Sequence, residues 1–110
     1  MKISIITVCY NRASVIQKAI ESVLAQTYKD IEYIVVDGAS TDGSMKVIET
    51  YKSRIQRIIS EPDHGMYEAI NKGIRMATGD VVGLMHSDDY FYDNRTVDSI
   101  AQAFEESGAD

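Results

Sequence analysis

The fold is decided by residues 31–44, which read IEYIVVDGASTDGS. Residues 31–36 are mostly apolar and β-branched and predict a strand, which ends on the pair Asp37-Gly38. Residues 38–44 are rich in the small polar residues that form turns and begin helices. A strand, a polar turn and the start of a helix, in that order, are the repeating unit of an α/β fold.

The same alternation continues on both sides of this stretch. Further strands are expected at 3–9, 55–59 and 81–85, with a loop at 62–65. Four helices are expected from apolar residues at helical spacing. In chain order, they are marked by Val15, Ile16, Ala19, Ile20, Val23 and Leu24; by Met45, Ile48 and Tyr51; by Tyr67, Ile70, Ile74 and Ala77; and by Val97, Ile100, Ala101 and Phe104. Gly79 is expected to stop the third helix and Asn94 to cap the fourth. This pattern predicts a doubly wound, mostly parallel α/β sheet with strand order 3-2-1-4.

The composition limits the classes of function. A chain of 110 residues with 45% hydrophobic residues suits one domain. Eleven Lys and Arg against seventeen Asp and Glu disfavour nucleic acid as a partner, but they allow a nucleotide held through a divalent cation. Cys9 is the only cysteine, so an internal disulfide is excluded. The longest apolar runs are too short for a membrane span or a signal peptide, which favours a cytoplasmic protein.

Polar residues follow three of the predicted strands. Tyr10 and Asn11 follow the first strand, Asp37 follows the second, and Asp88 and Asp89 follow the fourth. In a sheet of this kind, ligands bind in the crevice outside the carboxyl ends of the strands. The turn after the first strand has no glycine-rich phosphate loop, so a hard cation held by the paired carboxylates is the expected means of binding phosphates.

Each of these residues also has a purely structural interpretation. Asp88 and Asp89 could form a solvated turn that caps the next helix, Asp37 could be a turn residue, and Tyr10 could cover the end of the sheet. His64 and His86 are expected in loops or in the core rather than as ligands. Cys9 is expected to be a small buried hydrophobic residue.

Motifs in a fixed order then point to a family. They are SIITVCYN at 4–11, QTY at 26–28, VVDGASTDGS at 35–44, NKGI at 71–74, and GD at 79–80 with SDD at 87–89. Each motif is weak alone, but their order and spacing over nearly the whole chain resemble the family 2 glycosyltransferases with a GT-A, Rossmann-like fold. The resemblance implies inverting transfer of a sugar from a nucleoside diphosphate to an acceptor hydroxyl, in polysaccharide or glycoconjugate synthesis.

The resemblance also implies roles for individual residues. Thr7, Tyr10 and Asn11 would contact the nucleoside, and Asp37 would lie near the base or ribose. Asp88 and Asp89 match the DXD motif, in which the first would lie near the ribose and the second would hold Mn²⁺ or Mg²⁺. A UDP-sugar is the expected donor, and a saccharide or a lipid-linked molecule is the expected acceptor. The protein is expected in the cytoplasm or peripherally at the inner face of the membrane.

The sequence departs from the family pattern at two positions. Many members carry a second acid after the second strand that can read the base, whereas this chain has Gly38, so the donor base stays open. The DXD region often begins with an acid, and here that position is His86.

The chain is expected to be one nucleotide-sugar-binding part, residues 1–110, of a larger GT-A domain. The acceptor-binding part and the general base would lie beyond residue 110, so this chain alone would not transfer sugar, and its fourth strand could pair with another copy. Two alternatives remain: a non-catalytic nucleotide-sugar-binding module, and a receiver-type phosphoacceptor domain.

Overall fold

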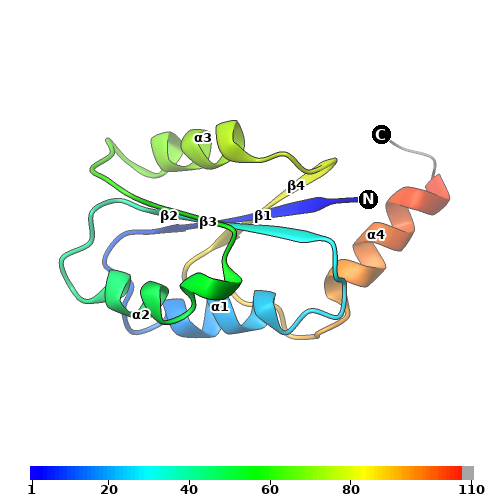
Figure 1. Cartoon of the computed structure of the whole chain (residues 1–110), viewed down its shortest axis with the longest axis horizontal. Coiled ribbons are helices and arrows are strands. Elements are labelled where there is room, and N and C mark those ends of the chain that lie inside the picture. The colour runs from blue at the N-terminus through cyan, green and yellow to red at the C-terminus, as the bar shows by residue number, and fades with distance from the viewer. Residues whose placement is uncertain (108–110) are drawn as a thin grey trace.

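A computed structural model of the chain describes residues 1–107 and contains a four-stranded parallel sheet in the order β3-β2-β1-β4 (Figure 1). The strands are β1 (Ile3–Cys9), β2 (Ile31–Asp37), β3 (Arg57–Ser60) and β4 (Val81–His86). The helices are α1 (Ile16–Leu24), α2 (Ser44–Thr50), α3 (Met66–Met76) and α4 (Thr96–Ser107), with a short 3-10 helix η1 (Lys52–Arg54). The predicted α/β class and strand order are confirmed.

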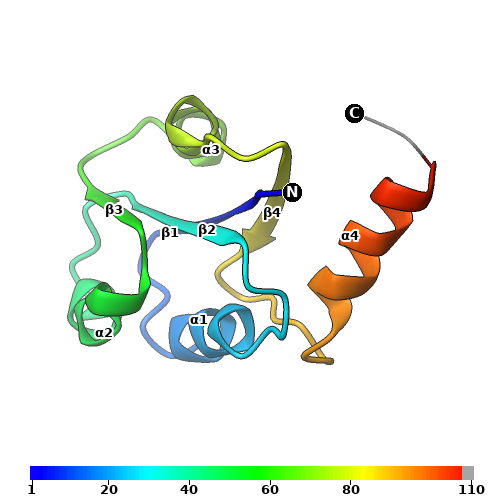
Figure 2. The same ribbon diagram turned by 45° about the vertical axis from the view of Figure 1, so that its right-hand side comes forward.

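Helices cover both faces of the sheet. Helices α1 and α2 lie below it and α3 lies above it, while α4 stands beside the end of the sheet at which the chain begins (Figures 1 and 2). The β1 strand is buried along its whole length. Its alternate residues Ile3 and Ile5 join the core between the sheet and α1, and Ile6 and Val8 join a smaller core between the sheet and α3. A strand buried on both faces explains the continuous apolar run from which it was predicted.

The register of the sheet brings three loops to one edge. Cys9 pairs with Asp37 of β2, and Val8 pairs with His86 of β4. The carboxyl ends of β1, β2 and β4 are therefore level, at the left of Figure 1. The residues that follow these strands meet there, as ligand-binding loops do in parallel sheets.

Two predicted boundaries differ from the structure. The third strand was expected at 55–59 but runs from Arg57 to Ser60. Ile55 is buried in the core before the strand. The side-chain oxygen of Gln56 accepts the hydrogen bond from Tyr33 N, at 2.6 Å, that a backbone carbonyl would accept in a continuing strand. At the start of α4, Gln26 rather than Asn94 supplies the side-chain acceptor, because Gln26 Oε1 accepts from Val97 N in the first turn at 2.9 Å. Asp93 accepts from Arg95 N at 2.7 Å just before the helix.

The face that helix α3 turns toward the sheet differs in part from the predicted face. Tyr67 and Ile74 were expected to pack inward but are 84% and 50% exposed, whereas Ala69 and Gly73 are buried. The helix approaches β1 so closely that a Cβ at Gly73 would lie 2.6 Å from Ile6 Cγ2. Small residues therefore form the closest contact. The predicted Ile70 and Ala77 do pack against the smaller core beside them, so the apolar periodicity was misleading only for Tyr67 and Ile74.

Gly79 does not stop α3, which ends at Met76. Its role is a close backbone approach instead, because a Cβ there would lie 2.6 Å from Ser4 Oγ and 2.7 Å from Ser4 N.

Candidate functional site

A cavity of about 960 Å³ opens at the carboxyl edge of the sheet. Its walls come from the end of β1 with the following loop, the turn after β2, residues 62–66 at the start of α3, and the end of β4 with its turn. These segments are far apart in sequence and meet only because the strands are parallel and in register.

Three of the predicted site residues line this cavity. Tyr10 directly follows β1 and is 61% exposed, so it is not a buried cover for the sheet. Asp88 and Asp89 are both exposed at the cavity, in a turn where Asp89 N donates to His86 O at 3.0 Å. That turn lies well before α4, which begins at Thr96, so the two acids do not cap this helix.

The other three predicted residues, Thr7, Asn11 and Asp37, are not among the residues that line the cavity. Thr7 is completely buried, and its hydroxyl forms a hydrogen bond of 2.9 Å with that of Tyr33. Burial raises the pKa of Tyr33, so this pair stays neutral. A nucleoside contact by Thr7 is a prediction that the geometry of residues 1–107 does not support.

Asp37 is also completely buried, and its carboxylate is occupied by neighbouring residues. Ser40 donates its backbone N–H to Oδ2 at 2.9 Å and its hydroxyl to Oδ1 at 2.5 Å, and Ser60 donates its hydroxyl to Oδ2 at 2.8 Å. Charge-assisted hydrogen bonds of this kind compensate for burying the carboxylate. The carboxylate of Asp37 therefore joins the ends of β2 and β3, and its predicted contact with base or ribose has no support in this arrangement.

Asn11 connects the loops that follow β1 and β2. It adopts φ of 51°, a left-handed conformation that Asn tolerates better than most residues. Its N–H donates to Ser40 Oγ and its side-chain oxygen accepts from Thr41 N, both at 2.8 Å. It fixes the loop directly after Tyr10 without reaching the cavity itself.

Asp42 and Ser44 continue this scaffold. Ser44 Oγ accepts from Arg12 N at 2.9 Å, and Asp42 Oδ2 accepts from Ala13 N at 3.0 Å. The hydrogen bond from the Ser44 hydroxyl, followed by that from Ala13 N–H, lowers the pKa of Asp42 below its ordinary value. The polar stretch after β2 thus orders the loop that carries Tyr10 and Arg12.

Three residues that line the cavity, and whose side chains could bind a ligand, were not predicted as site residues. Arg12 is the only Lys or Arg among the described residues that line the cavity, and it is exposed. Asp63 enters from the loop after β3, and His86 ends β4. The position of Arg12 three residues after a strand is a signal that could have identified it. Cys9 is 4% exposed, and burial raises the pKa of its thiol, which agrees with its expected role as a small buried residue.

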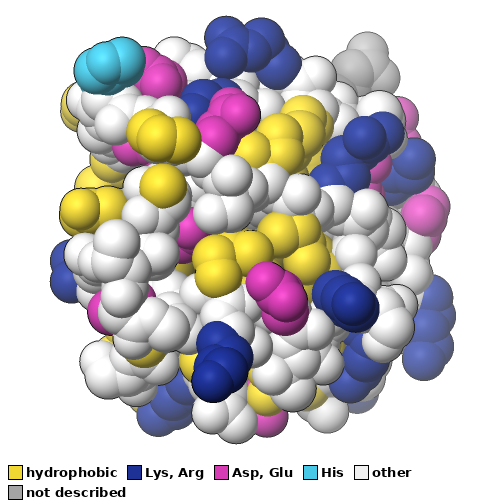
Figure 3. Space-filling model, turned by 60° about the vertical axis from the view of Figure 1, so that its left-hand side comes forward, with side chains coloured by type: hydrophobic (Ala, Val, Ile, Leu, Met, Phe, Trp, Pro, Cys, Tyr) yellow, Lys and Arg dark blue, Asp and Glu magenta, His cyan; other side chains and the backbone are white. Residues whose placement is uncertain are grey.

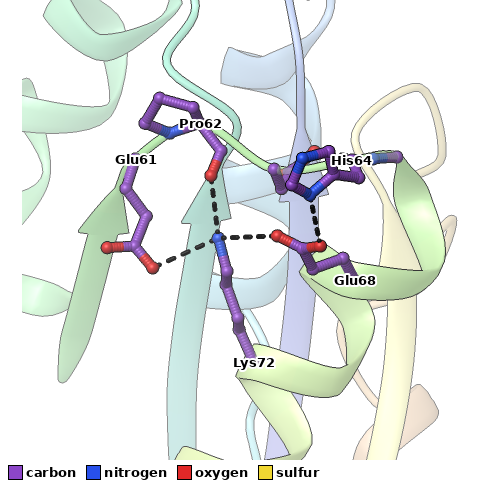
Figure 4. Close-up of polar contacts among 7 residues, drawn as sticks. Glu61, Pro62, His64, Glu68 and Lys72 are labelled. Atoms are coloured by element: carbon purple, nitrogen blue, oxygen red, sulfur yellow. Dashed lines mark hydrogen bonds and ion pairs between the residues drawn. The ribbon is translucent and has the colours of Figure 1, made fainter.

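The loop that carries Asp63 is held to α3 by a network of polar contacts (Figure 4). Lys72 Nζ lies 3.1 Å from Glu61 Oε1, 3.2 Å from the Pro62 carbonyl oxygen and 3.6 Å from Glu68 Oε1. The side chain of Lys72 is only 13% exposed, so these partners are needed to satisfy its charge. His64 Nδ1 lies 2.9 Å from Glu68 Oε2, and this hydrogen bond lowers the pKa of Glu68.

The donor groups at the cavity suit a cation that is shared with a ligand. Among residues 1–107, no group of three or more His, Cys, Asp and Glu side chains could hold a metal by itself. Mg²⁺ and Mn²⁺ are commonly bound through one or two carboxylates, with phosphate oxygens and waters as the other ligands. Asp88 and Asp89 fit that partial set of ligands.

The face drawn in Figure 3 shows no continuous basic stripe. On the face drawn in Figure 3, Lys and Arg side chains stand in separate places, with acidic and hydrophobic side chains between them. A phosphate backbone requires a continuous basic stripe. This mixed face agrees with the net charge of −6.

Comparison with known proteins identifies the family. Residues 4–110 match the profile of glycosyl transferase family 2. The chain belongs to this family. Its membership removes the receiver-type alternative and confirms the predicted family.

Proteins with similar sequences are also named glycosyltransferases. An uncharacterized glycosyltransferase of Mycobacterium tuberculosis is 38% identical over 104 residues, which are 94% of this chain and 38% of the relative. The glycosyltransferase GlyG of Streptococcus pneumoniae is 32% identical over 98% of this chain and 36% of its own length. The chain therefore spans less than two fifths of the length of these two relatives.

Solved structures of family 2 members share the fold. Residues 1–349 of TarS from S. aureus, in complex with UDP-GlcNAc, superpose with a TM-score of 0.89 at 27% identity, over 96% of this chain and 32% of that TarS chain. The mannosyltransferase PcManGT of Pyrobaculum calidifontis, in complex with GDP-Man and Mn²⁺, gives a TM-score of 0.81 at 26% identity, over 94% of this chain and 31% of that one.

Within residues 1–107, no helix has the length and hydrophobicity needed to cross a membrane.

Proposed function

We propose that the chain is the donor-binding part of an inverting glycosyltransferase and that its cavity binds a nucleoside diphosphate sugar. The observation that carries this proposal is the meeting of an aromatic ring, a guanidinium and two carboxylates, from Tyr10, Arg12, Asp88 and Asp89, around one cavity. The complexes of TarS with UDP-GlcNAc and of PcManGT with GDP-Man and Mn²⁺ support it.

Each residue has a role that follows from its chemistry. The exposed ring of Tyr10 offers a surface on which a base or ribose can stack. Arg12 is placed to bind phosphate oxygens, and Asp88 would accept hydrogen bonds from ribose hydroxyls. Asp89 would hold Mn²⁺ or Mg²⁺, which supplies positive charge that stabilises the diphosphate leaving group as the glycosidic bond breaks.

Thr7, Asn11 and Asp37 would act indirectly. Asn11 and Asp37 position the loop that carries Tyr10 and Arg12 through their contacts with Ser40, and Thr7 is part of the core. Substitutions of Asn11 or Asp37 would then weaken donor binding by moving that loop.

The acceptor side would be supplied by residues outside this chain. Inverting transfer needs a general base that takes the proton of the acceptor hydroxyl, and we place it beyond residue 110 together with the acceptor-binding part. The acceptor would be a saccharide or a lipid-linked molecule, met in the cytoplasm or at the inner face of the membrane. The 110-residue chain would bind donor without transferring sugar.

Thermal unfolding with a panel of UDP- and GDP-sugars, with and without Mn²⁺, tests donor binding directly. We expect at least one donor to raise the melting temperature more with Mn²⁺ than without it. Transfer assays then compare this chain with the longer protein that contains it. If the longer protein binds donor but transfers no sugar to any acceptor tested, the non-catalytic alternative is favoured.

A further inference from the structure

The carboxylate of Asp63 occupies the space beside Gly38. A Cβ built on Gly38 would lie 2.9 Å from Asp63 Oδ2 and 3.3 Å from Asp63 Cγ. Gly38 directly follows β2, whereas Asp63 comes from the loop after β3, and both residues line the cavity. The missing side chain at position 38 therefore makes room for an acid that a different loop provides.

Asp63 is held in a defined orientation. Its Oδ1 accepts a hydrogen bond from Gly65 N at 3.1 Å, and within residues 1–107 no donor contacts Oδ2. The contacts of Lys72 with Glu61 and the Pro62 carbonyl fix the chain immediately before it (Figure 4). One oxygen is thus anchored, and the other can accept a hydrogen bond from a ligand.

Asp63 lies beside Gly38, at the end of the cavity away from the carboxylates that follow β4. Asp88 and Asp89 follow β4, and Gly38 follows β2, so β1 separates these two ends of the cavity. Two strand spacings amount to about 10 Å. If Asp89, after β4, binds the diphosphate through a metal, as proposed above, the base lies toward Gly38 and Asp63.

We propose that Asp63 reads the Watson–Crick edge of the donor base by accepting its imino N–H. An ionised carboxylate can only accept hydrogen bonds. Uracil and guanine present a ring N–H at the centre of that edge, whereas cytosine and adenine present a lone pair there, which repels a carboxylate. The site therefore selects a uracil or guanine nucleotide against its cytosine or adenine counterpart. This inference depends on the proposed function.

Calorimetric titration with UDP, CDP, GDP and ADP in the presence of Mn²⁺ tests the inference. The protein is expected to bind UDP at least about 10-fold more tightly than CDP, or GDP than ADP, since hydrogen bonds to charged groups contribute that much. Asp63→Asn is expected to reduce the ratio to within about 3-fold, because an amide donates as well as accepts.

Two further variants separate an effect of the position of the Asp63 carboxylate from an effect of removing any negative charge. Gly38→Ala keeps the charge of Asp63 but requires the carboxylate to move, so it should also reduce the ratio. Asp30→Asn removes the same charge from an exposed residue just before β2, at the opposite edge of the sheet, and should leave the ratio unchanged. Circular dichroism and melting temperatures show whether each variant is folded.

The outcomes distinguish the inference from the function on which it depends. If no nucleoside diphosphate binds to the unaltered protein, the proposed function is wrong. If nucleotides bind but UDP and GDP have no advantage over CDP and ADP, or if folded Asp63→Asn keeps that advantage, the function stands and the role of Asp63 is overturned.

Discussion

The hydroxyl of Ser40 links Asn11 to Asp37: it donates to Asp37 Oδ1 at 2.5 Å and accepts from Asn11 N at 2.8 Å. A buried acid at the end of β2 thereby fixes the loop after β1, which carries Tyr10 and Arg12. The acid-rich motif after β2 acts in this structure as a support for the cavity.

Asp37→Asn is predicted to destabilise the protein by about 1–3 kcal/mol, because an amide cannot accept all three hydrogen bonds that Ser40 and Ser60 donate. Nucleotide affinity should fall to a similar extent with and without Mn²⁺, since the loop rather than the metal is disturbed. Urea unfolding and calorimetry measure the two effects. An effect on affinity without any loss of stability would instead indicate a direct contact with the nucleotide.

Arg12→Ala is predicted to weaken binding of a nucleoside diphosphate about 10-fold or more and to leave binding of the free nucleoside unchanged, because the guanidinium would contact only the phosphates. Arg75→Ala is a matched control, since Arg75 is exposed in the last turn of α3, away from the cavity. Equal losses for the nucleoside and the diphosphate would contradict this role.

Glu32 gives a prediction about pH. It is buried, and burial alone would raise its pKa, but hydrogen bonds from Thr78 and Ser4 outweigh burial and lower the pKa below its ordinary value of 4.5. An acid whose pKa is lowered by folding contributes stability above its unfolded pKa, and that contribution is lost as the pH falls through the folded pKa.

Glu32→Gln should therefore cost about 1–3 kcal/mol at pH 7, and the difference from the unaltered protein should shrink as the pH falls below 4.5. Urea unfolding between pH 7 and pH 3 measures it, with Glu49→Gln, an exposed acid on α2, as control. A cost that is independent of pH would show that the charge of Glu32 contributes nothing.

The outer edge of β4 gives a prediction about association. Within residues 1–107, β4 pairs only with β1, and Val82 and Leu84 on it are each 45% exposed. An open apolar edge favours pairing between copies, and a lysine on it opposes pairing. Leu84→Lys should shift the 110-residue chain toward monomer in sedimentation velocity, whereas Tyr67→Lys should not. Monomer at every concentration before substitution would contradict the prediction.

The sequence predicted the sheet well because apolar runs mark strands that are buried on both faces. The predicted strand ends lie within one residue of the observed ones, so Tyr10, Asp88 and Asp89 were predicted at the carboxyl edge of the sheet, where the structure places them beside the cavity. The direction of a side chain at a strand end cannot be predicted in the same way. Asp37 turns into the protein because Ser40 and Ser60 bind it there, and Ser60 reaches it only through the pairing of β2 with β3.

Contacts between distant segments explain the other misses. Asp63 enters the cavity because Gly38, on a different loop, leaves space for it. The buried face of α3 consists of Ala69 and Gly73 because the helix lies so close to Ile6. Small residues contribute little to a hydrophobic pattern in the sequence. Close contacts between a helix and a strand through such residues are therefore visible only in the folded structure.

The most direct test of the central claim is the affinity for a nucleoside diphosphate sugar, measured by calorimetry with Mn²⁺ and with a chelator, for the unaltered chain and for Asp89→Asn. We predict affinity at least about 10-fold higher with Mn²⁺, and the loss of most of this gain in Asp89→Asn, because a neutral amide is a poorer ligand for a hard cation. Equal affinity in Mn²⁺ and in chelator, or a gain that Asp89→Asn retains in full, would contradict it.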